Sequence, residues 1–298
     1  MTFSVIVANY NNGQYLPELI NSVLNQTYSN WELIIVDDCS TENPVKYIQT
    51  YLSDKRIKYL VHTINEGAGA AFKTAADQAI GDVMGMLGAD DALVPTALET
   101  MVKAHEQFPD ASMINSACYW CDEQLNILHK YEHYTALEPG QTLIRNLTVG
   151  SFATFKRAAY LKTAGFDNAF KRAVDHDIYL KLDEVGSLAF VHEPIYLYRK
   201  NAIGISQNDN GIKAAQFSIL AKYHAYKRRL GTSKDNLSKK EISSLRISWY
   251  LREIYQQRIS GNLQNCNSLI KQAIKEIPAI LLNKTFIVSL IRCNILGK

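Results

Sequence analysis

Acidic residues stand in adjacent pairs at two places in the first third of the sequence. The pairs are Asp37-Asp38 and Asp90-Asp91. Adjacent carboxylates repel each other unless a cation or hydrogen-bond donors compensate their charge. One Asp in a loop is usually a helix cap or an Asx turn, whereas two such pairs indicate a site for a hard cation.

Each pair follows a short apolar run of strand length. Between successive runs, the sequence has the pattern of a helix. The apolar runs are residues 3–8, 31–36, 57–62 and 83–87. This alternation predicts right-handed βαβ crossovers and an α/β fold with a mostly parallel sheet flanked by helices. Ligands bind at the carboxyl ends of such strands, so we expect Tyr10, Asp38, Asn65 and Asp90 around one crevice.

The pattern becomes purely helical from about residue 212. Helices are predicted over 212–230, 239–259 and 263–277, so we expect a domain at 1–211 and a helical region at 212–298. Residues 213–298 hold 16 Lys and Arg against 4 Asp and Glu, whereas residues 1–212 hold 16 against 25. A basic tail on an acidic body indicates contact with an anionic partner.

The composition narrows the class of protein. Of 298 residues, 47% are hydrophobic and 20% are charged, which is typical of a globular protein and excludes a disordered chain. Five scattered Cys do not form a disulfide framework, and no basic segment precedes the first apolar run. We therefore expect a cytoplasmic protein.

Several ordered motifs carry a resemblance to a known family. They are Val5-Ile-Val-Ala-Asn-Tyr-Asn-Asn-Gly, Ser22-Val-Leu-Asn-Gln-Thr, Trp31-Glu-Leu-Ile-Ile-Val-Asp-Asp-Cys-Ser-Thr, Asn65-Glu-Gly, Gly88-Ala-Asp-Asp, Gly165-Phe-Asp, Asp175-His-Asp-Ile-Tyr-Leu-Lys-Leu and Tyr198-Arg. Together they resemble family 2 glycosyltransferases of the GT-A fold over roughly residues 3 to 207. The C-terminal third lies outside the resemblance.

The resemblance implies a donor site for a nucleotide sugar. Ala8 and Tyr10 match the backbone and the aromatic ring that flank the nucleotide base. Asp38 matches the carboxylate that accepts a hydrogen bond from the base, which favours uracil or thymine, and Asn65 belongs to a matching motif beside it. The donor is therefore expected to be a UDP-sugar.

The resemblance also implies the cation site and the base. Asp90 and Asp91 match the acids that touch the ribose and bind Mg²⁺ or Mn²⁺, and Asp175 matches the catalytic base. Many relatives have Asp in place of Gly88 and His in place of Asn201, so the cation is expected to depend more on diphosphate oxygens.

The implied activity is metal-dependent, inverting transfer of a sugar to a hydroxyl of a surface glycan or a lipid-linked oligosaccharide. Two alternatives stay open. One is a catalytically silent subunit that binds nucleotide sugar, suggested by Gly88 and Asn201. The other is a nucleotidyltransferase, disfavoured because no Gly-rich, basic loop follows the first strand.

Weaker signals have simpler interpretations. Gly67-Ala-Gly69 follows a strand, but Phe72 stands where a dinucleotide loop needs Gly or Ala, so we predict a tight turn and a helix start. Cys118 and Cys121 have the spacing of half a zinc site without a second half. His176 either contacts the acceptor or packs on the protein surface.

The basic tail has two open interpretations. Lys284 and Arg292 interrupt its last apolar stretch, so a membrane-spanning helix is not expected. An amphipathic helix on an anionic membrane would use Phe286, Ile287, Leu290 and Ile291. Alternatively, the tail packs on the acidic body or on a second copy in a homo-oligomer. Nucleic acid is not an expected partner, because no binding motif accompanies the charge.

Overall fold

The computed structural model describes residues 1–131, 134–138, 140–147, 150, 152–201 and 209–295. The chain divides into two compact units, Met1–Ala214 and Ala215–Lys298. Residues 202–208, where the family resemblance ends, lie outside the described residues.

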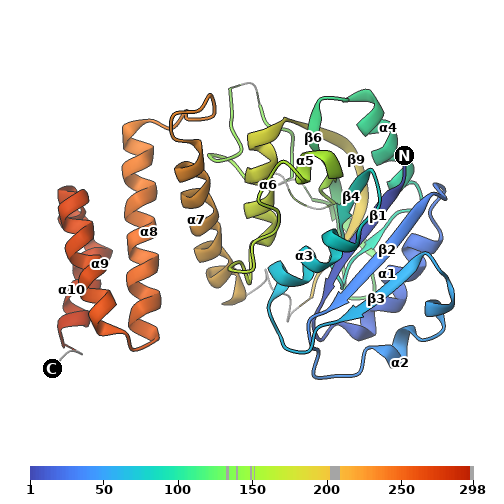
Figure 1. The fold of residues 1–298 in the computed structure, drawn as a ribbon, viewed down its shortest axis with the longest axis horizontal. Helices are drawn as coiled ribbons and strands as arrows, with labels where there is room; N and C mark the ends of the chain where they lie inside the picture. The colour runs from blue at the N-terminus through green and yellow to red at the C-terminus, as the bar shows by residue number, and fades with distance from the viewer. Residues whose placement is uncertain (132–133, 139, 148–149, 151, 202–208, 296–298) are drawn as a thin grey trace. The chain divides into compact units, whose positions relative to one another are not determined.

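The first unit is built on a mixed sheet. Within the described residues, nine strands form it, eight of them in the order β3-β2-β1-β4-β8-β6-β9-β5, with β7 paired to β6 (Figure 1). The first half contains the parallel strands β1 (Phe3–Asn9), β2 (Trp31–Asp37), β3 (Ile57–Val61) and β4 (Val83–Met86). These strands coincide with the predicted apolar runs, because strands covered on both faces are apolar throughout.

The second half of the sheet mixes directions. It contains β5 (Ala92–Leu93), β6 (Ala111–Cys121), β7 (Ile127–Lys130), β8 (Thr154–Lys156) and β9 (Ser187–Arg199). The long pair β6 and β9 is parallel, whereas β8 runs antiparallel to both β4 and β6. The predicted α/β class, with a parallel sheet core flanked by helices, is confirmed.

Helices connect these strands. They are α1 (Leu16–Leu24), α2 (Val45–Ile48), α3 (Ala68–Gln78), α4 (Ala97–Gln107), α5 (Arg157–Tyr160) and α6 (Val174–Val185), with short 3-10 helices η1 (Gly13–Tyr15) and η2 (Tyr51–Ser53). Leu16, Leu19, Ile20 and Val23 form the buried face of α1. The parallel pairing of β1 with β2 and with β4 brings the carboxyl ends of these strands to one edge of the sheet, where the predicted residues Tyr10, Asp38 and Asp90 follow them.

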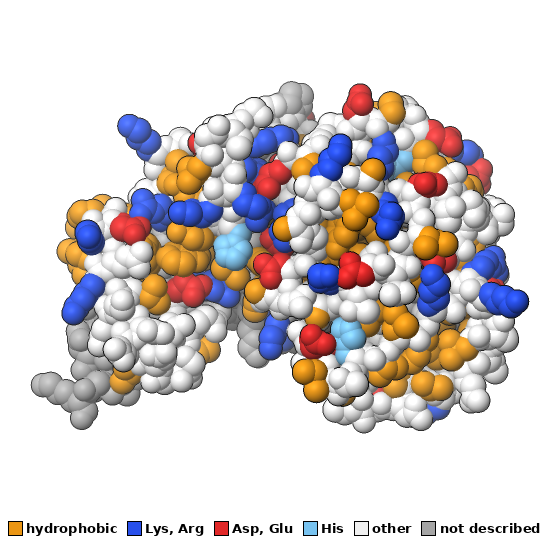
Figure 2. Space-filling view, in the orientation of Figure 1, with side chains coloured by type: hydrophobic (Ala, Val, Ile, Leu, Met, Phe, Trp, Pro, Cys, Tyr) orange, Lys and Arg blue, Asp and Glu red, His pale blue; other side chains and the backbone are white. Residues whose placement is uncertain are grey.

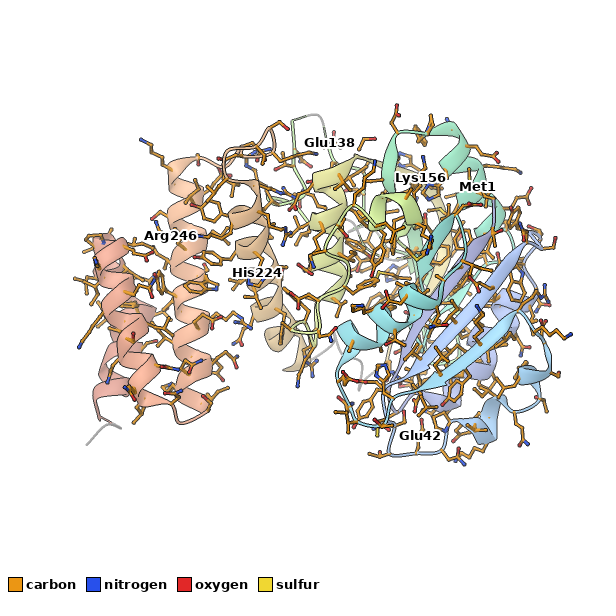
Figure 3. The ribbon with its side chains drawn as sticks, viewed as in Figure 1. Met1, Glu42, Glu138, Lys156, His224 and Arg246 are labelled. Carbon is orange, nitrogen blue, oxygen red and sulfur yellow. The ribbon has the colours of Figure 1, made fainter. Side chains whose placement is uncertain are left out.

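The second unit is helical. Helix α7 (Asp209–Arg229) crosses the division, and α8 (Lys239–Ile259), α9 (Leu263–Glu276), η3 (Pro278–Leu282) and α10 (Lys284–Ile295) follow. Ser238 and Glu241 form a capping box at the start of α8. Arg246 of α8, labelled in Figure 3, pairs with Glu276 of α9. In the described part of the chain, no helix has both the length and the apolar character needed to cross a bilayer.

Candidate active site

The two acids at the end of β2 are both buried and both held by donors from the protein. Asp37 Oδ1 accepts hydrogen bonds from Asn9 Nδ2 at 2.6 Å and from Ser40 Oγ at 2.5 Å. These bonds tie the end of β1 to the loop after β2. Asp37 therefore shapes the site without facing a ligand.

Asp38 holds the next loop in the same way. Its Oδ1 accepts from His62 Nδ1 at 2.8 Å and from Glu66 N at 2.9 Å, and its Oδ2 accepts from Gly67 N at 2.6 Å. A carboxylate offers about four acceptor positions, so one position is left after these three bonds. Any contact from Asp38 to a nucleotide base has to use that remaining position.

The turn at Gly67 brings two distant parts of the chain together. Gly67 has a φ of 96°, and a Cβ on Gly69 would lie 2.4 Å from Asp167 O and 2.7 Å from Phe170 O. Gly69 N also donates to Phe170 O at 3.2 Å. The predicted tight turn is confirmed, and it packs the segment that precedes α6 against the loop held by Asp38.

Asp175 lies in the first turn of α6. Its side chain is 43% exposed, and one carboxylate oxygen is 4.0 Å from His176 Nε2. The residue before this helix, Ala173, has a left-handed backbone with a φ of 49°. Such a conformation costs a non-glycine residue about 1 kcal/mol or more, and it is often found beside functional groups.

A chain of aromatic rings runs from Tyr134 to Tyr198 near the end of β9. Burial, then the charges of Tyr198 and Asp175, raise the pKa of Tyr134 well above its usual range, so Tyr134 lies within electrostatic reach of both. The Tyr134 ring meets Tyr131 edge-on at 4.8 Å, Tyr131 stacks on Trp120 at 5.2 Å, and Trp120 stacks on Tyr198 at 5.1 Å. Among the described residues, no hydrogen bond or ion pair joins Asp175 directly to Asp38, Asp90 or Asp91.

The two acids at the end of β4 lie in different surroundings. Asp91 is buried, with Oδ2 accepting from Tyr196 Oη at 2.6 Å and Oδ1 accepting from Arg199 N at 2.8 Å. Burial, and next the charge of Asp90, raise the pKa of Asp91 well above its usual range. A Cβ on Gly88 would lie 2.4 Å from Asp91 Oδ2, so Gly88 leaves the space that the buried carboxylate occupies.

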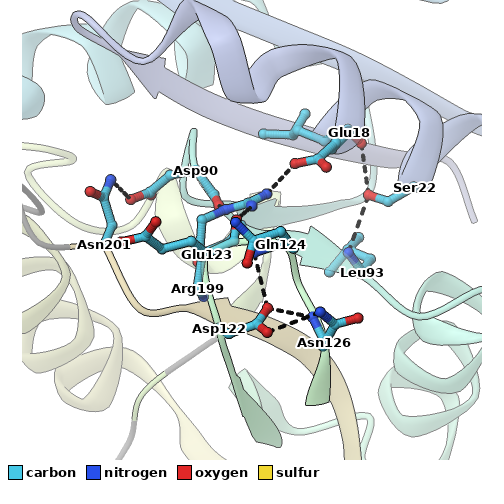
Figure 4. Close-up of polar contacts among 12 residues, drawn as sticks. Glu18, Ser22, Asp90, Leu93, Asp122, Glu123, Gln124, Asn126, Arg199 and Asn201 are labelled. Carbon is cyan, nitrogen blue, oxygen red and sulfur yellow. Dashed lines mark hydrogen bonds and ion pairs between the residues drawn. The ribbon is translucent and has the colours of Figure 1, made fainter. Parts of the chain in front are cut away.

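Asp90 is half-buried and its carboxylate has one partner from the protein in the described contacts. Asn201 Nδ2 donates to Asp90 Oδ2 at 2.8 Å, as Figure 4 shows. Among the described residues, no three His, Cys, Asp or Glu side chains form a group suited to a metal ion. Asp90 still fits Mg²⁺ or Mn²⁺, because such ions commonly bind one or two carboxylates together with substrate phosphates. Asp91 is directed to Tyr196 and Arg199, and its predicted share in binding the metal stays a prediction.

Arg199 holds the loop that carries Asp90. The Arg199 side chain is 2% exposed. Its Nε donates to Asp90 O at 2.5 Å, its two Nη groups donate to Glu123 O and to a carboxylate oxygen of Glu18, and its guanidinium lies 4.7 Å from the Tyr15 ring centre (Figure 4). One buried cation therefore holds three separate segments, around Tyr15 and Glu18, around Asp90 and around Glu123.

The remaining predicted donor-site residues line the loops after β1 and β3. Ala8 is half-buried and pairs with Val36 across β1 and β2. Tyr10 is 42% exposed, and Asn65 is exposed in the loop before α3. An exposed ring at the end of a buried strand is free to stack on a planar ligand.

Sequence reasoning missed the roles of Arg199, Glu18, Tyr196 and His62. Arg199 was noted only as the end of a motif, although an Arg that ends a largely apolar strand already indicates a buried cation with several partners. The pairing of Glu18 with Arg199 spans 181 positions, so no local pattern could have predicted it.

Comparisons with known proteins agree with this geometry. The model of the family described as "Glycosyl transferase family 2" matches residues 4–164. The chain is 29% identical to the putative colanic acid biosynthesis glycosyl transferase WcaA of Escherichia coli over 261 residues, which are 83% of this chain and 90% of WcaA. It is 28% identical to a chondroitin synthase of Escherichia coli over 194 residues, 65% of this chain, and the chain spans only 28% of that longer protein.

The fold is also similar to a solved structure. The crystal structure of S. aureus TarS 1–349 in complex with UDP-GlcNAc superposes with a TM-score of 0.62 at 16% sequence identity, covering 94% of this chain and 84% of that one. At this identity the similarity concerns the fold, and it includes the C-terminal helices in the compared region.

Proposed function

The chain belongs to glycosyl transferase family 2, and from this membership we propose that it transfers a sugar from a nucleotide-sugar donor to a hydroxyl group of a glycan or lipid-linked oligosaccharide. The predicted resemblance to this family is confirmed. The observation that carries the proposal is the match over residues 4–164, which includes the ends of β1, β2 and β4 where Tyr10, Asp38 and Asp90 lie.

We propose UDP as the nucleotide. Uracil has an N3–H donor, and Asp38 keeps one acceptor position after its three bonds to the protein. The exposed Tyr10 ring offers a stacking surface for the base. TarS, whose fold this chain shares, was solved with UDP-GlcNAc, which supports a UDP-sugar without identifying the sugar.

Asp175 is the proposed general base. It removes the proton from the acceptor hydroxyl while the oxygen attacks the anomeric carbon, and the bond from that carbon to the diphosphate oxygen breaks. The nucleoside diphosphate leaves with the bonding electron pair. A single displacement from the opposite face inverts the anomeric configuration.

Asp90 is the proposed protein ligand for Mg²⁺ or Mn²⁺, with diphosphate oxygens completing the coordination. Such an ion would neutralise the charge that develops on the leaving diphosphate. Asn201 positions the Asp90 carboxylate, and Arg199 positions the Asp90 backbone. Asp91 supports this loop from inside the protein.

The acceptor class is proposed from two sources. The names of two relatives refer to the synthesis of chondroitin and of colanic acid, and both products are polysaccharides. Part-exposed Tyr131 and His176 lie on the Asp175 side of the site, where a hydroxyl-bearing acceptor has to approach the base. A growing surface polysaccharide fits these features.

The test is a panel of nucleotide sugars with Mn²⁺, measured by thermal stabilisation and by release of nucleoside diphosphate. A ligand at 100 times its dissociation constant should stabilise the folded state by about 2.7 kcal/mol. We expect stabilisation by UDP-sugars together with slow release of UDP. Binding without any turnover would instead support the silent subunit, and release of pyrophosphate from a sugar phosphate and UTP would support the nucleotidyltransferase.

A further inference from the structure

A groove with basic walls runs along helix α8 of the second unit. It has a volume of about 360 Å³ and is lined by α8, by Gln216 and Ile219 of α7 and by the start of α10. Its polar side chains are Gln216, Ser248, Arg252, Arg258, Thr285 and Ser289. The residues from α8 repeat every three or four positions, which places them on one face of the helix. Guanidinium and hydroxyl donors together suit a phosphate group.

The positive charge of this groove is only partly compensated. All four acids of residues 215–298 have partners elsewhere or at one end of the groove: Asp235 accepts from Gly231 N, Glu241 caps α8, Glu276 pairs with Arg246 and Glu253 pairs with Arg252. In the described part of the chain, no ion pair involves Arg258. The buried Nε of Arg252 likewise has no hydrogen-bond partner there. An anion in the groove would give Arg258 an ion-pair partner and Arg252 Nε a hydrogen-bond acceptor.

Large apolar side chains are exposed on η3 and at the start of α10. Leu281, Leu282, Ile287 and Val288 are all exposed, Leu282 at 85% of its surface, and Val288 also lines the groove. Figure 2 shows apolar side chains beside Lys and Arg on the C-terminal helices. Single exposed apolar residues are ordinary, but four within eight positions form a patch that water solvates poorly.

We propose that the second unit binds anionic phospholipid at a membrane surface. Arg252 and Arg258 hold the headgroup phosphate, and Leu282, Ile287 and Val288 enter the boundary between headgroups and acyl chains. A soluble phosphate ester would account for the arginines but not for the exposed apolar patch. This inference is independent of the proposed glycosyl transfer.

The structure changes the sequence prediction for α10 in one respect. Phe286, predicted to face the lipid, is fully buried in the core formed with Tyr250, Ile254 and Cys266. It anchors α10 to α8, while its neighbours Ile287 and Val288 stay exposed. The side chains of Leu290 and Ile291, also predicted for that face, lie outside the described residues.

The test is flotation of the full-length protein with vesicles of phosphatidylcholine and phosphatidylglycerol, compared with phosphatidylcholine alone. We expect binding to the anionic vesicles only. Because each Lys or Arg near an anionic surface contributes a factor of about five, the double variant Arg252→Gln/Arg258→Gln should bind about thirtyfold more weakly. Leu282→Ser should weaken binding at every salt concentration, because its contribution is apolar.

Matched controls separate the groove from general charge and from unfolding. Lys271→Gln/Lys275→Gln removes two exposed cations from α9, and Ile80→Ser removes an exposed apolar side chain from the first unit. Both should bind nearly as well as the wild type. The single variants Arg258→Gln and Leu282→Ser are expected to stay folded, and thermal melts check this. Weaker binding by these folded variants cannot then be due to misfolding. Absence of flotation with anionic vesicles, or equal loss in the α9 control and the groove variant, would overturn the proposal.

Discussion

The acidic pairs at the ends of β2 and β4 look alike in the sequence but differ in the folded protein. At β2, both Asp37 and Asp38 are buried and each accepts several hydrogen bonds from the protein. At β4, Asp91 is buried and bonded on both oxygens, whereas Asp90 is half-buried and bonded to Asn201. Asp90 is therefore the least enclosed of these four acids.

The difference shows how a turn separates neighbouring side chains. At β4, Gly88 leaves room for the second carboxylate to turn inward beneath the strand end. At β2, the loops after β1 and β3 supply donors from both sides, so both carboxylates are enclosed. Both members of the first pair therefore hold loops together, whereas in the second pair only Asp91 is enclosed and Asp90 is the proposed cation ligand.

The largest expected effect concerns the open acid at β4. Asp90→Asn should lower kcat/KM by about 10³-fold, because it removes the proposed cation ligand from the developing diphosphate charge. Steady-state kinetics with Mn²⁺ would measure this. Asp77→Asn, which removes an exposed acid from a surface pair with Lys73, is the control and should leave the rate unchanged. An equal kcat/KM for the wild type and Asp90→Asn would show that Asp90 does not bind the cation.

The buried acid at β4 should affect stability instead. Asp91→Ala removes the acceptor of the hydrogen bonds that the Tyr196 hydroxyl and the Arg199 backbone N–H donate, which costs about 2 to 4 kcal/mol in the free energy of unfolding. Urea denaturation would measure the loss. Asp90→Ala, in the same loop, should cost less than about 1 kcal/mol. Equal stability of the two variants would contradict the assignment of a structural role to Asp91 and not to Asp90.

The pH dependence of stability should also differ between the pairs. The pKa of Asp91 is raised in the folded protein by burial and by Asp90, so its folded state favours the protonated acid. The contribution of this raised pKa to the free energy of unfolding is therefore full below the pKa of Asp91 in the unfolded chain. It is lost as the pH rises through the pKa of Asp91 in the folded protein. Relative to Asp91→Asn, the wild type should lose unfolding free energy as the pH rises from about 4. A constant difference across this range would contradict the prediction.

A smaller effect is expected from the support of the β4 loop. Glu18→Gln weakens the ion pair that helps Arg199 hold the Asp90 backbone, and it should lower kcat/KM by about tenfold or less, since a charge-assisted bond is worth about 1.5 to 3 kcal/mol before partial compensation. Glu106→Gln, an exposed acid on α4, is the control. We expect the KM for Mn²⁺ to rise in Glu18→Gln alone.

Much of the fold could be predicted from the sequence, because strands buried on both faces are continuous apolar runs. The second half of the sheet could not, since the pairing of β6 with β9 depends on contacts between segments more than 60 residues apart. At the site, residue types indicated the strand ends correctly. The inward turn of Asp91 could not be predicted, because it depends on Tyr196 and Arg199 from a strand 105 and 108 positions later.

The most direct test of the central claim is calorimetry of UDP binding with and without Mn²⁺ in the wild type, Asp90→Asn and Asp38→Asn. If Asp90 alone supplies the carboxylate to the cation, Mn²⁺ should strengthen UDP binding in the wild type and in Asp38→Asn, but not in Asp90→Asn. Asp38→Asn should weaken binding equally with and without the metal. An undiminished Mn²⁺ effect in Asp90→Asn would contradict the account.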